Sequence, residues 1–390
     1  MEKLRIGVIG IGNMGTGHVR NIREGQCPEI ELTAACDIDA NRLKWITEFT
    51  GGEVAVFSDA LELMDSGLVA AVLIAVPHYG HPVYAKEAFK RGLHVMSEKP
   101  AGVYTKQVRE MNEAAAASGL VFGLMFNQRT DPVYRKMKEI IESGELGTIR
   151  RTNWLITNWY RPQAYYDSGS WRATWSGEGG GVLLNQCPHN LDLWQWICGL
   201  PQTVRAFCHF GKWHDIEVED DVTAYVEYPN GATGTFITTT ADYPGSNRFE
   251  IDCEKGKLLY DGGKLSMWAL DQSEPEYSRT HRQSFSHPEA AYSEPEIIGS
   301  GTGHVGVLNA FADAVLHGGS LIARGEEGIR SLELANAMLL STWLGQEIKL
   351  PVDEDVYYAE LEKRARQSRV KPQSAASGPA DLAGTFGGAS

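Results

Sequence analysis

The sequence predicts two domains, a doubly wound α/β domain followed by a strand-rich α+β domain. At 390 residues the chain exceeds the usual span of one domain. Short apolar runs alternate with helical patterns over the first third, which is typical of a parallel sheet covered by helices on both faces. From Ile149 onward the chain is rich in strand formers and aromatic residues. We place the first domain at residues 1–126, the second at 127–370, and a flexible tail rich in Ser, Ala and Gly at 371–390.

Apolar, often β-branched runs in the first domain predict six strands, and the amphipathic stretches between them predict helices. The predicted strands are Leu4–Gly10, Glu31–Asp37, Val54–Phe57, Val69–Pro77, His94–Ser97 and Leu120–Asn127. The predicted helices are Met14–Glu24, Ala40–Thr50, Ser58–Ser66, His81–Arg91 and Thr105–Ser118. This alternation favours βαβ units.

The second domain shows fewer clear elements. Its predicted helices are Asp131–Ser143, Gln186–Cys198, Val305–His317 and Glu326–Leu344. Alternating runs at Val222–Tyr228 and Thr233–Thr240, joined by Pro-Asn-Gly, predict a hairpin. The polar, proline-dotted stretch Asp271–Gly303 is expected to be a long loop.

Charge and composition exclude several classes of function. The net charge is −14 and no lysine- or arginine-rich block occurs, so we expect no nucleic-acid partner. The longest apolar run, Leu68–Val76, is far shorter than the roughly 20 residues of a membrane helix, and no signal peptide is recognised. The six cysteines form no C-x-x-C pair and the histidines show no zinc-ligand spacing. We therefore expect a cytoplasmic protein with reduced thiols, no membrane contact and no metal.

A glycine motif between the first strand and the first helix predicts a dinucleotide site. Gly10, Gly12 and Gly15 form a G-x-G-x-x-G pattern, with Asn13 and Met14 at the start of the helix. The first glycine allows a tight turn, the second leaves room for the pyrophosphate, and the third allows close helix–strand packing. The amino end of the helix then offers free N–H groups to the phosphates.

The residue after the second strand selects the cofactor. Asp37 lies about 20 residues past the glycines, where a carboxylate can bond the adenosine ribose hydroxyls. Its charge would repel the extra phosphate of NADP, so we predict NAD. The alternative is that Asp37 caps the helix that begins near Ala40.

Two further strand ends meet the same crevice, because ligands of open α/β sheets bind at the carboxyl ends of the strands. The fourth strand ends near Pro77, His78 and His81, and the fifth near Glu98 and Lys99. We predict that these five residues line the cofactor site.

The motifs together resemble those of the Gfo/Idh/MocA oxidoreductases, which include glucose–fructose oxidoreductase and inositol dehydrogenases. The resemblance extends to about Asp353 and rests on five segments: the glycine motif with Asp37, Glu98-Lys99-Pro100, Gly144–Ile149, Gly179–Asp192 and Gly325–Gly328. It implies a Rossmann domain followed by a domain with a large, mostly antiparallel open sheet. It also implies a homo-oligomer, a dimer or a tetramer, assembled through that sheet.

The resemblance implies roles for Lys99 and His189 beside nicotinamide and substrate. Oxidation of a secondary alcohol needs a proton acceptor, and a histidine with a pKa near operating pH suits a general base. The lysine supplies positive charge beside the developing alkoxide. The alternative for His189 is a helix-start histidine bonded to backbone.

One position departs from the family's commonest pattern. Inositol dehydrogenases carry an aspartate four residues before the histidine, and this chain has Asn185. Asn185 is therefore expected either to contact the substrate or to be the N-cap of the helix that contains Pro188. Asp192, three residues beyond His189, is expected either to polarise the imidazole or to pair with a neighbour.

The aromatic segment before the histidine motif suggests a carbohydrate pocket, because flat rings stack on sugar C–H faces; the alternative is core packing. Family positions add contacts at the end of the sixth strand. The predicted substrate contacts are Asn127, Arg129, Tyr160, Arg161, Tyr165, Trp175, Asn185 and His189.

The resemblance implies an NAD-dependent oxidoreductase that transfers a hydride between nicotinamide and a ring secondary alcohol of a sugar, glycoside or polyol. The glucose 3-hydroxyl is the preferred case, motivated by Asn185 and the aromatic segment. Three alternatives stay open: an inositol dehydrogenase, a redox-neutral NAD-dependent glycosidase, and a non-catalytic NAD-binding sugar sensor. The presence of both Lys99 and His189 argues against the sensor.

Overall fold

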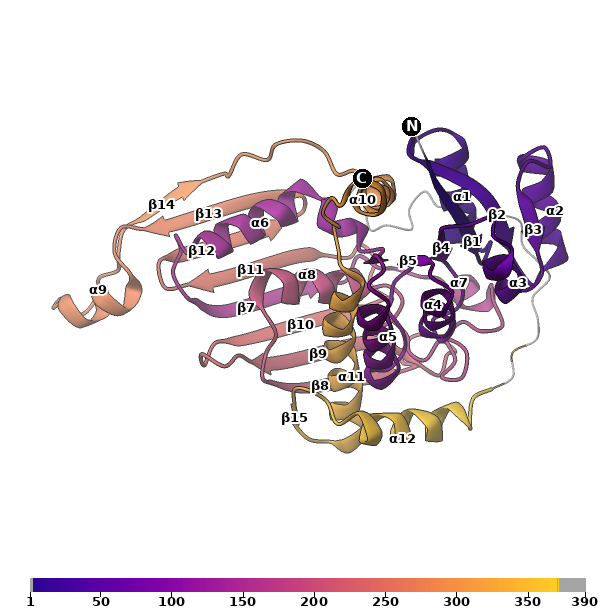
Figure 1. The fold of residues 1–390 in the computed structure, drawn as a ribbon. Coiled ribbons are helices and arrows are strands. Elements are labelled where there is room, and N and C mark those ends of the chain that lie inside the picture. The colour runs from indigo at the N-terminus through magenta and orange to yellow at the C-terminus, as the bar shows by residue number, and fades with distance from the viewer. Residues whose placement is uncertain (1–2, 370, 372–390) are drawn as a thin grey trace.

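Two sheets organise the chain, as the computed structural model shows for residues 3–369 and 371 (Figure 1). Apart from residue 371, the predicted tail lies outside the described residues.

The first sheet has six parallel strands in the order β3-β2-β1-β4-β5-β6. The strands are β1 Leu4–Ile9, β2 Ile30–Cys36, β3 Ala55–Phe57, β4 Ala71–Ile74, β5 His94–Ser97 and β6 Phe122–Leu124. The order reverses between β1 and β4, which makes the carboxyl ends of these strands the place for a ligand. The predicted doubly wound sheet is confirmed.

Helices cover both faces of this sheet. They are α1 Asn13–Arg23, α2 Ala40–Phe49, α3 Ala60–Asp65, α4 Gly80–Lys90 and α5 Thr105–Ser118. One face packs against α3, α4 and α5, and the other against α1, α2 and the distant helix α10 (Gly303–His317). Leu308 and Phe311 of α10 are fully buried with the side chains of β1. A helix from beyond residue 300 thus completes the first layer.

The second sheet has nine strands in the order β14-β13-β12-β11-β7-β10-β9-β8-β15. The strands are β7 Ile149–Ile156, β8 Thr203–Phe210, β9 Glu219–Glu227, β10 Thr233–Thr239, β11 Asn247–Cys253, β12 Gly256–Asp261, β13 Lys264–Leu270, β14 Ala290–Ser293 and β15 Ile348–Lys349. Every neighbouring pair is antiparallel except β7 with β10. The predicted large, mostly antiparallel sheet is confirmed, as is the β9–β10 hairpin.

One face of the second sheet lies under the helices α6 (Pro132–Ser143), α8 (Pro188–Cys198) and α11 (Gly328–Leu344) (Figure 1). Stacked rings fill the space between the layers: Trp154 packs on Phe249 at 4.3 Å between ring centroids, and Trp194 packs on Phe236 at 5.4 Å. The remaining helices are α7 Gln163–Asp167, α9 Glu274–Thr280, α12 Glu354–Ala365, η1 Asn127–Thr130 and η2 Gly325–Glu327.

The long loop predicted at Asp271–Gly303 is wrong in part, because it contains α9 and β14. All four side chains of β14 are exposed, so the strand lacks the apolar alternation that marks a half-buried strand. The proposed division at residue 126 stays a prediction. The six cysteines are free. Within the described ranges, no helix is long and apolar enough to cross a membrane.

Candidate active site

The glycine turn leaves an open space at the amino end of α1. Gly10 has a φ of 92°, and a Cβ there would lie 2.6 Å from the backbone oxygen of Ala75. A Cβ on Gly15 would lie 1.9 Å from the backbone oxygen of Gly10, so helix and strand touch through backbone. A Cβ on Gly12 would meet no atom within 4 Å. Asn13 and Met14 open the helix, as predicted. The turn therefore fits a pyrophosphate at the free N–H groups of α1.

Asp37 is held against this turn. Its Oδ2 accepts the Ile11 N–H at 2.6 Å and its Oδ1 accepts the Asp39 N–H at 2.9 Å. Asp39, not Asp37, caps α2 by accepting the Asn41 N–H. The capping alternative is therefore wrong for the α2 N-terminus, and a contact of Asp37 with the ribose stays a prediction.

The two histidines after β4 face protein atoms. His81 is buried, and its ring nitrogens lie 2.7 Å from the backbone oxygens of Pro100 and Val76. These contacts join the end of β4 to the Glu-Lys-Pro turn and occupy both ring nitrogens of His81. The predicted contact of His81 with the cofactor therefore stays a prediction. His78, next to Pro77, donates through Nδ1 to the backbone oxygen of Glu178 at 3.1 Å, across to the second domain.

Glu98 is a buried carboxylate paired with a histidine of α1. Its Oε1 lies 2.7 Å from His18 Nε2. Burial raises the pKa of Glu98, but the hydrogen bond and charge of His18, with the charges of His304 and Lys99, outweigh it and bring the pKa to about 2. Glu98 is therefore negatively charged at neutral pH, at the carboxyl end of β5.

Lys99 reaches across to the second domain. Its Nζ donates to the backbone oxygen of Asn185 at 2.9 Å. Burial lowers the pKa of Lys99, the charge of Glu98 opposes this, and the charges of Arg161 and Arg172 lower the pKa further. Lys99 of the first domain therefore contacts the second-domain segment that contains Asn185 and His189.

His189 lies in the first turn of α8 and is 5% exposed. Its Nδ1 has no hydrogen-bond partner among the described residues, so the expected backbone bond at this nitrogen is not formed. Burial lowers the pKa of His189 well below its usual range, the charges of Lys99 and His304 lower it further, and Glu98 opposes them. A neutral imidazole follows, and a neutral imidazole can accept a proton.

Asn185 is not the N-cap of α8, because the helix begins at Pro188 with Cys187 at the cap. Its side-chain amide instead donates to the carboxylate of Glu178 and accepts from the Tyr165 hydroxyl at 3.1 Å. The capping alternative is therefore wrong. The other alternative, a substrate contact, stays a prediction.

Arg129 lies in a buried ion-pair cluster. Its guanidinium binds both oxygens of Asp192 at 2.7 Å and also pairs with Glu327, and the residue is 3% exposed. Asp192 therefore pairs with Arg129, as one of its two alternatives expected. Because carboxylates of the protein already bind the guanidinium, a substrate contact of Arg129 stays a prediction. The adjacent Asn127 has a buried Oδ1 that lacks a partner among the described residues.

The aromatic segment divides into packing and crevice residues. Trp175 is buried against Phe210 and Trp343, as core packing predicts. Tyr160 is largely exposed and lies beside Tyr243.

Tyr165 lies between two guanidinium groups. Arg161 and Arg172 lie 5.2 Å and 4.5 Å from its ring centroid. Core packing is therefore confirmed for Trp175, whereas a sugar contact of Tyr165 stays a prediction.

Sequence reasoning missed Glu178, His18 and His304. A glutamate in a glycine-rich stretch resembles a solvated loop residue, yet Glu178 is 2% exposed. Its place directly before the Gly179–Asp192 motif, seven residues before Asn185, is the signal that could have found it. His18 of α1 contacts Glu98 directly, and His304 of α10 lies 5.6 Å from the His18 ring between centroids because α10 packs beside α1; no local pattern shows either contact.

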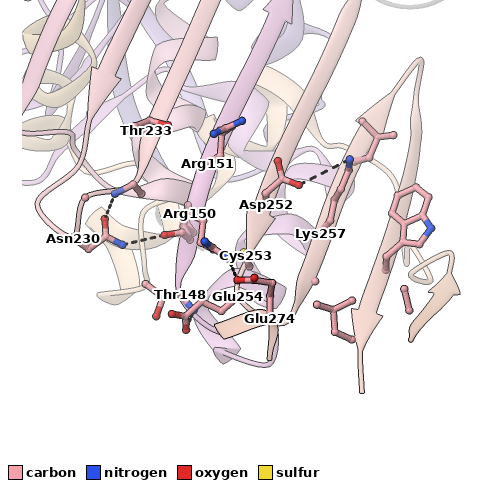
Figure 2. A pocket seen from close by; sticks show the side chains of 18 of the residues that line it. Thr148, Arg150, Arg151, Asn230, Thr233, Asp252, Cys253, Glu254, Lys257 and Glu274 are labelled. Carbon is pink, nitrogen blue, oxygen red and sulfur yellow. Dashed lines mark hydrogen bonds and ion pairs between the residues drawn. The ribbon is translucent and has the colours of Figure 1, made fainter. Parts of the chain in front are cut away.

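A second concavity lies elsewhere, on the face of the nine-stranded sheet that carries no helices. It has a volume of about 1050 Å³ and is lined by charged side chains of β7, β11 and β12, among them Arg151, Asp252 and Lys257 (Figure 2). Arg150 pairs there with Glu274. None of the predicted site residues lines it; the candidate active site is the place where Lys99 and His78 bond the backbone of Asn185 and Glu178.

The candidate metal ligands of the described chain are equally remote. Glu29, Asp313 and His317 lie within 4.8 Å of one another at the surface. Exposed acidic groups often meet without an ion, and we assign no metal there.

Comparisons with known proteins agree with this geometry. A family model described as an oxidoreductase family with an NAD-binding Rossmann fold matches residues 4–126, and a GFO/IDH/MocA C-terminal domain matches residues 134–259. Inositol 2-dehydrogenase of Pseudarthrobacter chlorophenolicus is 32% identical across 67% of this chain and 78% of that protein. Levoglucosan dehydrogenase of Pseudarthrobacter phenanthrenivorans is 24% identical across 87% of this chain and 96% of that protein.

Among solved structures, the WlbA dehydrogenase of Chromobacterium violaceum in complex with NADH and UDP-GlcNAcA has a TM-score of 0.78. It is 28% identical and covers 90% of this chain and 97% of its own.

Proposed function

Because the chain belongs to the GFO/IDH/MocA family of NAD-binding oxidoreductases, we propose that it oxidises a ring secondary alcohol of a sugar, glycoside or polyol. One observation carries the proposal: the half-buried Lys99 of the first domain bonds the Asn185 backbone in the histidine motif, close enough to the buried His189 for its charge to lower the pKa of His189. A cation and a neutral base side by side suit the removal of a hydroxyl proton.

NAD, when bound with its pyrophosphate at the glycine turn, supplies the hydride acceptor. Asp37 would bind its adenosine ribose. Lys99 would stabilise the negative charge that grows on the substrate oxygen, and His189 would take the proton. His189 is 5% exposed, so water has little access to the proposed base.

The substrate class rests on the relatives and on the crevice. The relatives named above act on or bind carbohydrates and inositol, according to their names. Arg161 and Arg172, which lie over the Tyr165 ring, offer donors for hydroxyl groups. The glucose 3-hydroxyl is our preferred position. Inositol is the second candidate, which the inositol 2-dehydrogenase relative supports.

The test is near-ultraviolet absorbance of NADH with the purified protein, NAD and a panel of glucosides, free sugars and inositols. A rise with glucosides supports the preferred case, and a rise with inositols alone rejects it. Aglycone release without NADH would indicate the redox-neutral glycosidase. Lys99→Ala should lower kcat by about 10²–10³-fold with NADH affinity retained. Turnover that survives this change would contradict the mechanism.

We also propose a homo-oligomer formed through the bare face of the nine-stranded sheet. Phe207 of β8, 56% exposed, Tyr225 of β9 and Ile237 of β10 present apolar surface there. Light scattering should give a dimer or tetramer, and Phe207→Glu should shift it toward monomer. A wild-type monomer would contradict this proposal and leave the catalytic one untouched.

A further inference from the structure

Glu178 is a buried carboxylate that the proposed mechanism does not use. Its Oε2 accepts the Ala173 N–H at 2.6 Å, and its Oε1 accepts the side-chain amide of Asn185. Its side chain has no ion pair within 4 Å among the described residues, and Arg172 and Lys99 act on it only at longer range. Burying a carboxylate without a direct counter-ion is costly, so such groups concentrate at functional sites.

A directed hydrogen-bond chain starts at this carboxylate. The Asn185 amide donates to Glu178, the Tyr165 hydroxyl donates to the Asn185 oxygen at 3.1 Å, and Arg172 Nη1 donates to the Tyr165 oxygen at 2.7 Å. Gln186 Nε2 lies 3.2 Å from both the Tyr165 and the Asn185 oxygens.

The two ends of the chain fix its direction. A carboxylate only accepts and a guanidinium only donates, so the amide must turn its NH₂ to Glu178 and its oxygen to Tyr165. The single hydroxyl hydrogen of Tyr165 is thereby committed to Asn185.

The backbone of the same two residues contacts the crevice. The backbone oxygen of Asn185 accepts from Lys99 Nζ at 2.9 Å, and that of Glu178 accepts from His78 Nδ1 at 3.1 Å. A shift of the Glu178–Asn185 contact would therefore move both Tyr165 and Lys99.

We propose that Glu178 is a positioning residue, whose carboxylate orients the Asn185 amide and through it sets Tyr165 and Lys99 for the substrate. It places a negative charge, from seven residues upstream, against the neutral side chain of Asn185. The inference rests on the proposed function, since it assigns the residue to that reaction.

A relocation of the charge tests the proposal. In Glu178→Gln the amide can still accept the Ala173 N–H, but it no longer fixes the Asn185 amide. We expect kcat/KM to fall about 10–100-fold, as for a lost hydrogen bond to a charged group. The kcat/KM of Asn185→Asp alone should also fall, because two carboxylates then face each other. The double variant should recover at least about tenfold over Glu178→Gln, since its relocated carboxylate accepts from both the introduced amide and the Tyr165 hydroxyl.

Two outcomes overturn the inference: Glu178→Gln within twofold of wild type, or a double variant no more active than Glu178→Gln. A merely structural role at the Ala173 turn predicts the first outcome. In a Tyr165→Phe background, Glu178→Gln should cost clearly less than in wild type, because the hydroxyl that it orients is gone. Melting temperatures of all variants separate folding losses from kinetic ones.

The proposed function can fail separately. If the wild-type protein oxidises no member of the panel, that function fails, and sugar binding in the presence of NADH, followed by tryptophan fluorescence, replaces turnover. Weaker binding in Glu178→Gln that the double variant restores would still support the positioning role. Equal binding in all three proteins would reject it.

Discussion

The glycine turn that would hold NAD and the proposed substrate side are built by different means. On the cofactor side, the backbone shapes the site: glycines at 10, 12 and 15 permit a close turn, and one carboxylate, Asp37, stands beside it. On the proposed substrate side, side chains from distant parts of the chain form a network, in which Asn185 is hydrogen-bonded to both Tyr165 and Glu178. A backbone site tolerates change where space is open, whereas a side-chain network depends on every member.

The largest expected effect lies on the substrate side, at the proposed base. His189→Asn should lower kcat/KM by about 10²–10⁴-fold, the range for a lost general base. Since burial lowers the pKa of His189, the base form persists below pH 6.5 in the wild type. The rate should stay level between pH 7 and 6.5 and fall only as pH drops through the lowered pKa. A pH profile of kcat/KM checks this, and a fall centred at or above 6.5 would contradict the assignment.

A variant of Arg129 tests whether the buried cluster around it serves the stability of the fold and not substrate binding. Arg129→Leu leaves Asp192 as an uncompensated buried charge and should lower the free energy of unfolding by about 3–5 kcal/mol. Urea denaturation measures it. The exposed pair Lys106–Asp355 serves as the matched control, and Lys106→Ala should change stability little. An unchanged stability together with a raised KM would show that Arg129 contacts substrate.

The cofactor side offers a smaller effect that separates binding from folding. Gly12→Ala places a methyl group in open space, so the melting temperature should stay constant while the Kd for NADH rises about tenfold through crowding of the pyrophosphate. Gly15→Ala is the contrast, because its Cβ collides with the Gly10 oxygen and should lower the melting temperature. NADH fluorescence titration and thermal melting measure the two. Unchanged NADH affinity in Gly12→Ala would place the pyrophosphate elsewhere.

The smallest effect is expected at Asp37. Asp37→Asn should weaken NAD binding about fivefold by loss of a charged hydrogen bond, and should raise the relative activity with NADP. The asparagine keeps an oxygen for the Ile11 N–H, so the turn should survive. Steady-state kinetics with each cofactor measure this preference. An unchanged ratio of kcat/KM with NAD to kcat/KM with NADP would leave Asp37 with a structural role alone.

This contrast also explains how much the sequence could predict. The six strands of the first sheet and the glycine turn follow from local patterns, and the structure confirms them. The edge strand β14 was not predicted, because its side chains are all exposed and show no apolar alternation. Glu178 escaped because its burial depends on the packing of segments distant in the sequence. The capping alternative for Asn185 fails for a related reason, since the helix begins only at Pro188.

Helix α10 has a consequence for synthesis on the ribosome. Leu308 and Phe311 complete the apolar layer over β1, although about 300 residues separate them from that strand. While the first domain leaves the ribosome, this apolar layer is exposed to solvent and can associate with other nascent chains. The first domain to be made is therefore among the last to be finished, and the growing chain needs protection until residue 317 is free of the exit tunnel.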